Sequence, residues 1–150
     1  MPEQGEIRLF FEKHSIMIKR IAHIGIAVKD LNTAQSTFET LLNLSPSHVE
    51  RVEEQKVDVS SFHVDDTNLE LTAGISEDSP ISKFIEKRGE GIHHMAFEVD
   101  DINAELERLK AAGVRLIDEQ PRMGADNFLV AFIHPKSAGG VLVEICQKAG

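Results

Sequence analysis

The sequence contains no tryptophan and no tyrosine, and cysteine occurs once, at Cys146. A single cysteine excludes an internal disulfide and fits a reducing compartment, so we expect a cytoplasmic protein in which this thiol is packed and unreactive. No stretch approaches the roughly 18 consecutive apolar residues that a membrane helix needs. The acidic first 17 residues also lack the apolar run of a secretory signal. The core must therefore be built from aliphatic side chains and phenylalanine.

Positive charge is also scarce in this chain. The 150 residues include 16 Lys and Arg against 25 Asp and Glu, which gives a formal net charge of −9. This balance argues against nucleic acid or a membrane surface as a partner, so local cations would have to hold any anionic ligand. The length and the 41% hydrophobic content are enough for one domain. We expect residues 1–16 to be an N-terminal extension and residues 17–150 to form that domain.

Two segments of the chain have similar sequence patterns. Residues 21–31 are IAHIGIAVKDL and residues 91–102 are GIHHMAFEVDDI, and they align with a constant offset that places His23 on His94. The alternation of side chains in both segments predicts strands. A constant offset indicates a duplicated module, so the two histidines are expected to be equivalent.

The rest of the pattern predicts the element order β-α-β-β-β in two modules, at about residues 18–74 and 91–147. A helix with an apolar stripe follows each histidine strand, and short apolar segments, including one at 114–117, predict the later strands. A further helix at 77–88 is expected to link the modules. The predicted fold class is α+β, with paired modules that form an eight-stranded half-open barrel around the histidines.

Each module ends in an apolar strand pattern that contains one glutamate. Burial of a carboxylate among apolar residues is costly unless the carboxylate has a partner. Imidazole and carboxylate groups together favour Mn, Fe, Co, Ni or Zn over Ca or Mg, so the pattern predicts one divalent metal ion. Its expected ligands are His23, Glu70, His94 and Glu144. The alternative is that the histidines have structural partners and that the glutamates pair with nearby Lys or Arg.

Strand alternation also predicts the surroundings of the two metal histidines. His93 is expected on the apolar face of its strand, separated from His94 and packed in the core or under a helix. Gly25, Ala27 and Ala96 lie on the same face as the metal histidines. Their small side chains are expected to leave room for a ligand.

Three stretches of the sequence resemble known proteins. The segment HIGIAVKDL, from His23, resembles the vicinal oxygen chelate (glyoxalase) superfamily in general. The run SPISKFIEKRGEGIHHMAFEVDDI, from Ser79, and the pair HPKS and GGVLVE, from His134, resemble more narrowly the methylmalonyl-CoA epimerase family. This resemblance extends over about residues 18–148. It implies paired β-α-β-β-β modules around a metal ion.

The activity that this resemblance implies is the interconversion of (R)- and (S)-methylmalonyl-CoA in propionate metabolism, through a metal-stabilised enolate. The family's metal ligands fall on His23, His94 and Glu144, and Glu70 lies where relatives have Gln or Glu. Glu144 would also act as an acid/base group. Inversion needs a second such group on the opposite face. Val59 occupies the position where some relatives have a glutamate, so this second group stays unassigned.

The resemblance also suggests which residues meet the acyl-CoA substrate. Lys136 and Ser137, in the HPKS motif, are expected to bind the CoA portion or the substrate carboxylate, although a solvent-exposed turn would have the same sequence. Glu98 and a metal-bound water are candidates for the second acid/base group. A homodimer is a further expectation from the family.

Three alternatives share parts of this pattern. A lactoylglutathione lyase uses similar ligands, but it is disfavoured by the HPKS and SPI motifs. An extradiol dioxygenase needs two histidines and one glutamate around iron, so a fourth ligand at Glu70 argues against it. The third is a metal-free binding protein of the same fold, like the bleomycin-resistance proteins, which generally lack the ligand set. Stoichiometric metal in the purified protein would distinguish it.

Overall fold

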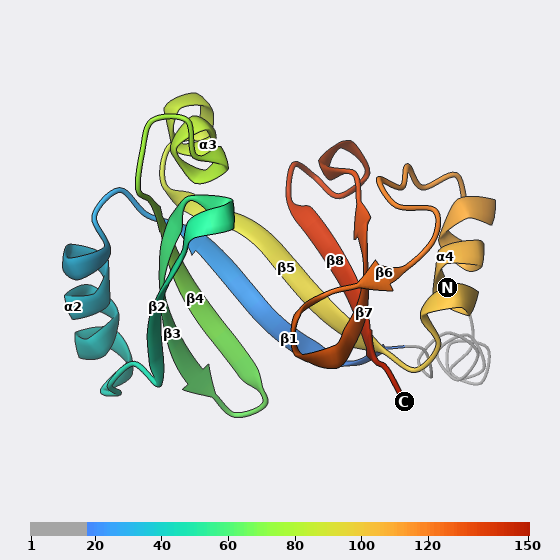
Figure 1. Cartoon of the computed structure of the whole chain (residues 1–150), viewed down its shortest axis with the longest axis horizontal. Helices are drawn as coiled ribbons and strands as arrows, with labels where there is room; N and C mark the ends of the chain where they lie inside the picture. The colour runs from blue at the N-terminus through green and yellow to red at the C-terminus, as the bar shows by residue number, and fades with distance from the viewer. Residues whose placement is uncertain (1–17) are drawn as a thin grey trace, which may run out of the picture. The chain divides into compact units, whose positions relative to one another are not determined.

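The computed structural model of the protein describes residues 18–150, so the predicted extension at residues 1–16 lies outside the described residues. The chain divides into two compact units (Figure 1). One unit contains residues 21–96. The other contains residues 97–150 together with the described residues 18–20. Within residues 18–150, no helix is long and apolar enough to cross a membrane.

The elements follow the order β-α-β-β-β, then a linking helix, then β-α-β-β-β again (Figure 1). The first set and the linking helix are β1 (Ile18–Ala27), α2 (Leu31–Leu42), β2 (His48–Val52), β3 (Val57–Val64), β4 (Thr67–Gly74) and α3 (Pro80–Arg88). The second set is β5 (Gly91–Val99), α4 (Ile102–Ala111), β6 (Arg122–Met123), β7 (Phe128–Ile133) and β8 (Leu142–Lys148). Short 3-10 turns are η1 (Glu53–Gln55), η2 (Ala125–Asn127) and η3 (Pro135–Ser137).

The strands hydrogen-bond in the order β2-β3-β4-β1-β5 in the unit of residues 21–96 and in the order β8-β7-β6 in the other unit. β1 and β4 are parallel, whereas the pairs β2–β3, β3–β4, β6–β7 and β7–β8 are antiparallel. Strand pairing in the unit of residues 21–96 is therefore mixed, with β2 at an edge, and β6 is an edge strand in the other unit. This architecture confirms the predicted α+β class with paired modules.

One predicted strand is wrong. Residues 114–117 form no strand, and Leu116 makes only an isolated bridge to Ile133. Beyond this bridge the side chain of Asp118 accepts a hydrogen bond from the backbone N–H of Phe132 (2.9 Å). A side chain therefore bonds to β7 where a strand partner would continue the ladder, and the second strand of the second module is instead the two-residue β6.

The unit of residues 21–96 is built around α2 and the strands that it covers. The side chain of Asp30 caps the helix by accepting from the backbone N–H of Thr33 (2.9 Å). Asn43 ends the helix in the left-handed conformation. The helix contributes its apolar stripe to a core around the buried side chains of Phe62 and Leu71. This core lies on the face of β4 opposite Glu70, because side chains alternate along a strand.

The unit of residues 97–150 repeats this arrangement with α4. Asp101 caps α4 by accepting from the backbone N–H of Ala104 (3.1 Å). Ile102 and Leu106 are buried with Ile145 of β8 in the core of the unit. In the β7–β8 pair, Phe132 lies opposite Glu144. The same capping carboxylate and inward helix stripe therefore occur in both modules.

Candidate metal centre

Three of the four predicted metal ligands meet within the unit of residues 21–96. They are His23 on β1, Glu70 on β4 and His94 on β5, and their ligand atoms lie within 4.8 Å of one another. Oε1 of Glu70 is 3.7 Å from Nε2 of His94 and 4.0 Å from Nε2 of His23. The two imidazole rings are in edge contact, with centroids 5.3 Å apart. The structure thus brings the repeated histidines together beside one carboxylate.

The pairing of β1 with β4 explains how these side chains converge. In the parallel register Gly25 lies opposite Glu70, so the two residues occupy the same face of the sheet. A Cβ added at Gly25 would be 1.9 Å from Cε1 of His94. The ring of His94 therefore fills the space that a side chain at position 25 would occupy. Gly25 thus makes room for the imidazole of His94, and whether the small residues also leave room for a bound molecule remains a prediction.

The electrostatic environment keeps Glu70 ionised. Burial is the largest influence on its pKa and would raise it. The interaction with His94 and the positive charges of His23 and His94 together outweigh burial, so the pKa of Glu70 lies below its usual range. The carboxylate is therefore an anionic donor at neutral pH.

The donor set fits a divalent transition metal. Two borderline imidazole nitrogens together with one hard carboxylate oxygen suit Zn, Co, Mn, Ni or Fe. Ligand atoms about 2.1 Å from an ion lie about 3.0 Å apart when they are at right angles. The separations of 3.7 and 4.0 Å need a contraction of roughly 1 Å or less. Each side chain is about a quarter exposed or less, so solvent still reaches the site.

His93 contacts His94, one of the candidate metal ligands, although strand alternation places the two side chains on opposite faces. Its Nδ1 is 3.0 Å from Nδ1 of His94. Its ring also packs edge-on against Phe84 of α3, with centroids 4.8 Å apart. The predicted packing under a helix is confirmed, but the predicted separation from His94 is wrong. Burial, followed by the charge of His94, lowers the pKa of His93 to about 4, so this ring is neutral at pH 7.

Glu144, the fourth predicted ligand, belongs to the other unit. It lies on β8, half-buried, and faces the same side of the strand as Cys146. Burial raises the pKa of the Cys146 thiol to about 11, and the negative charges of Glu144 and Glu98 raise it further. This pKa and the 4% exposure of Cys146 agree with the prediction of a packed thiol. Metal coordination by Glu144 remains a prediction.

The predicted substrate residues Lys136 and Ser137 lie in the turn η3. The backbone N–H of Lys136 donates to Nδ1 of His134 (3.0 Å), and the side-chain oxygen of Ser137 accepts from the backbone N–H of Arg115 (2.9 Å). The Lys136 side chain is exposed. His134 therefore has a structural role in shaping the turn, and the role of Lys136 and Ser137 in substrate binding remains a prediction.

Glu98, the candidate second acid/base group, is engaged in ion pairs. Nε and Nη2 of Arg20 donate to its Oε1 at 3.2 and 3.1 Å. Nζ of Lys19 lies 3.5 Å from its other oxygen. Two cations thus hold a carboxylate whose side chain is only 12% exposed. These pairs favour a structural role for Glu98.

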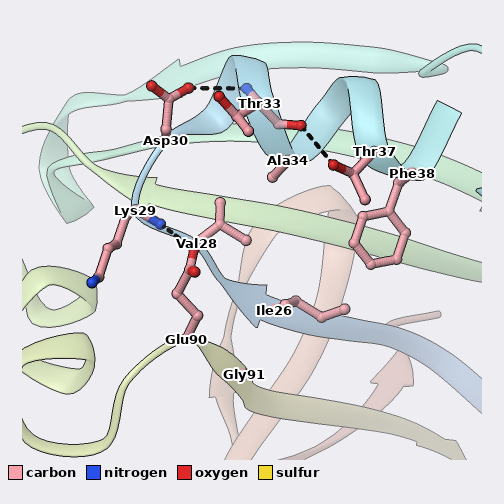
Figure 2. Close-up of a pocket in the computed structure, with 10 residues that line it drawn as sticks. All are labelled: Ile26, Val28, Lys29, Asp30, Thr33, Ala34, Thr37, Phe38, Glu90 and Gly91. Carbon is pink, nitrogen blue, oxygen red and sulfur yellow. Dashed lines mark hydrogen bonds between the residues drawn. The ribbon is translucent and has the colours of Figure 1, made fainter. Parts of the chain in front are cut away.

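A pocket of about 450 Å³ lies beside α2, on the face of β1 opposite His23 (Figure 2). Ile26, Ala34 and Phe38 line it, and at one end the backbone N–H of Lys29 donates to Glu90 (2.8 Å). Along β1 the side chain of Ile26 points to the face opposite that of His23 and Gly25, because side chains alternate along a strand. The pocket is therefore separate from the metal centre and contains none of the predicted ligands.

Comparison with known proteins connects this site to a family. Residues 22–132 match the model of the Glyoxalase/Bleomycin resistance protein/Dioxygenase superfamily. An uncharacterized protein of Bacillus subtilis is 44% identical over 89% of this chain and 95% of its own length. The human mitochondrial methylmalonyl-CoA epimerase is 38% identical over 85% of this chain and 73% of its own length. A solved Streptomyces coelicolor methylmalonyl-CoA epimerase variant, in complex with 2-nitronate-propionyl-CoA, superposes with a TM-score of 0.72 at 34% identity, covering 89% of this chain and 96% of the other.

Proposed function

Because the chain belongs to the Glyoxalase/Bleomycin resistance protein/Dioxygenase superfamily and, within it, to the methylmalonyl-CoA epimerase family, we propose that it is a metal-dependent epimerase that interconverts (R)- and (S)-methylmalonyl-CoA. The observation that carries this proposal is the meeting of His23, Glu70 and His94 on one face of the unit of residues 21–96. These residues would hold the metal ion, with Glu144 as a fourth ligand.

The reaction needs stabilisation of negative charge and transfer of a proton. The α-proton of methylmalonyl-CoA is acidified by the neighbouring thioester, and its removal leaves an enolate. A divalent ion supplies Lewis-acid stabilisation of the charge that develops on the thioester oxygen. The ionised Glu70 and the two histidines would provide donors for such an ion at neutral pH.

Glu144 is the residue that we propose for proton transfer on one face of the substrate. A carboxylate can take the α-proton and return one, which is the role of a general acid/base. Lys136 and Ser137 are proposed to bind the anionic parts of the acyl-CoA, and the exposed Lys136 supplies a local cation on a chain of net charge −9. We also propose that the enzyme acts in propionate metabolism in the cytoplasm as a homodimer.

Exchange of the α-proton in deuterated water tests the proposed reaction. The protein is incubated with methylmalonyl-CoA in D2O, and deuterium incorporation is followed by NMR. We expect exchange that stops after EDTA treatment and returns when Co2+ or Mn2+ is added. Exchange that EDTA leaves unchanged would contradict the metal dependence, and an absence of exchange with every metal tried would contradict the reaction.

Glu144→Gln separates proton transfer from metal binding. Glutamine keeps a neutral oxygen donor but cannot carry the proton, so we expect bound metal to be retained while exchange falls by about 100- to 10,000-fold. Metal content is measured by atomic emission and exchange by the same NMR assay. Wild-type exchange in this variant would exclude Glu144 as the acid/base group.

Lys136→Ala tests substrate binding, with Lys148→Ala as the matched control. Both lysines are exposed and belong to the same unit. We expect the first substitution to raise KM with little change in kcat, and the second to change neither. Equal KM values in the two variants would remove Lys136 from the substrate site.

A further inference from the structure

The adjacent histidines of β5 are joined by a contact that the metal-binding residues do not require. Nδ1 of His93 and Nδ1 of His94 lie 3.0 Å apart, which is hydrogen-bond distance. The ring planes are nearly perpendicular, at 84°, with centroids 5.2 Å apart. Two ring nitrogens at this distance can share one proton, with one nitrogen as donor and the other as acceptor.

The opposite edge of the His94 ring points to the metal centre. Its Nε2 lies 3.7 Å from Oε1 of Glu70, and the ring covers the backbone at Gly25. A histidine binds a metal through a ring nitrogen that carries no proton. In neutral imidazole an unprotonated Nε2 requires the proton to be on Nδ1. The only tautomer of neutral His94 that can bind through Nε2 is therefore the one that donates from Nδ1.

The surroundings of His93 suit the role of acceptor. Its ring is half-buried, and the edge contact with Phe84 of α3 fixes its orientation at centroids 4.8 Å apart and 89° between planes. A ring held in this way presents Nδ1 to His94 in a constant direction. Ligand histidines generally use their second nitrogen for such a hydrogen bond, which sets the tautomer and the ring orientation.

We propose that His93 is a positioning residue of the metal centre: its Nδ1 accepts a hydrogen bond from Nδ1 of His94 and so holds His94 in the tautomer whose Nε2 is free to bind the ion. The opposite polarity of this hydrogen bond would place a proton on Nε2 of neutral His94 and block the site. This inference rests on the proposed metal site, and its first test is done without metal.

The tautomer of His94 is measured on the metal-free protein by 15N NMR of the histidine side chains, at about pH 8, where ordinary histidines are neutral. We expect the Nδ1–H form of His94 in the wild type. A predominant Nε2–H form would overturn the inference even if the protein binds metal. Conversely, a protein that shows the Nδ1–H form but binds no metal would contradict the proposed function and leave the hydrogen bond established.

Two substitutions separate the hydrogen bond from packing. His93→Phe keeps an aromatic ring against Phe84 but has no acceptor, whereas His93→Asn places an oxygen near the position of Nδ1 but loses the ring contact. If His93 acts through the hydrogen bond, Co2+ affinity falls about 10- to 100-fold in His93→Phe and stays within about threefold of wild type in His93→Asn. Affinity is measured by calorimetry, and the Co2+ absorption spectrum reports the ligand geometry.

Other results would overturn the proposal. Wild-type affinity in His93→Phe would show that the acceptor is dispensable. Loss of affinity in His93→Asn together with retention in His93→Phe would assign the effect to packing on α3, and so would equal losses in both variants. Thermal unfolding in EDTA shows whether each variant folds, and the tautomer of His94 is measured again in both. We expect His93→Asn to retain the Nδ1–H form.

Discussion

Gly25→Ala is expected to weaken metal binding strongly with only a moderate loss of stability. The added Cβ would be 1.9 Å from Cε1, 2.3 Å from Nε2 and 2.4 Å from Nδ1 of His94. Non-bonded carbon atoms prefer separations of about 3.5–4.0 Å. The imidazole must therefore move by roughly 1.5–2 Å, whereas metal–ligand distances tolerate only about 0.2 Å.

The size of the effect follows from this displacement. Even the loss of a group that supports a ligand weakens metal affinity by about 10- to 100-fold, so displacement of the ligand itself should weaken it by at least about 100-fold. Overpacking of one methyl group typically costs about 1–3 kcal/mol of unfolding free energy. We expect a folded protein of reduced stability that binds Co2+ poorly in calorimetric titration after EDTA treatment.

A double-mutant cycle with His94→Ala tests whether the clash between the added Cβ and the His94 ring causes the loss of stability. Removal of the ring removes the clash, so Gly25→Ala should destabilise the His94→Ala background by much less than it destabilises the wild type. The coupling energy from urea unfolding should be about 1–3 kcal/mol. Gly124→Ala is the control for an added Cβ that does not meet His94. Its Cβ would approach a methyl group of Val130, in the other unit, at 2.9 Å. Additive stabilities, or wild-type metal affinity in Gly25→Ala, would refute the reasoning.

Three further predictions concern stability and the thiol. Phe62→Ala should lower the unfolding free energy in urea by about 3–5 kcal/mol, because Phe62 is fully buried; a loss below 1 kcal/mol would contradict this packing. Asp101→Ala should remove the cap of α4 and lower the unfolding free energy by about 1 kcal/mol. Asp101→Asn should retain most of that stability, because asparagine can also cap a helix; equal losses in the two variants would exclude capping. The pKa of Cys146 is raised to about 11 in the folded state from an ordinary value of 9.0. The unfolded chain loses this proton first, so folding stability contributed by Cys146 should decline as pH rises from about 9 to 11, and Cys146→Ala should remove that part of the pH dependence.

Much of the metal centre was predictable because it depends on a repeat and on strand alternation. The equivalence of His23 and His94 follows from the repeated sequence, and the position of Glu70 on the same face follows from side-chain parity in β4. Coordination of a metal ion by these three residues and by Glu144 remains a prediction.

The features that were missed depend on contacts that alternation does not encode. Four of the five residues of β2 are exposed, so the strand lacks the apolar alternation that would reveal it. At residues 114–117 the apolar residues suggested a strand, but Asp118 supplies a hydrogen bond that replaces a regular ladder. For His93, strand alternation predicts the direction of Cβ but not the position of the imidazole ring, and Nδ1 of His93 still contacts Nδ1 of His94.

β1 and β4 are parallel neighbours, and the segment that connects them contains α2, β2 and β3. This segment must be ordered before β4 can pair with β1. Pairings between distant parts of a chain form slowly, because the connecting segment must first be ordered. During synthesis on the ribosome His23 emerges well before Glu70 and His94, and an ion would then meet a solitary imidazole. Metal acquisition should therefore follow translation of β5. A bound ion should lengthen the lifetime of the native protein more than it accelerates the early steps of folding.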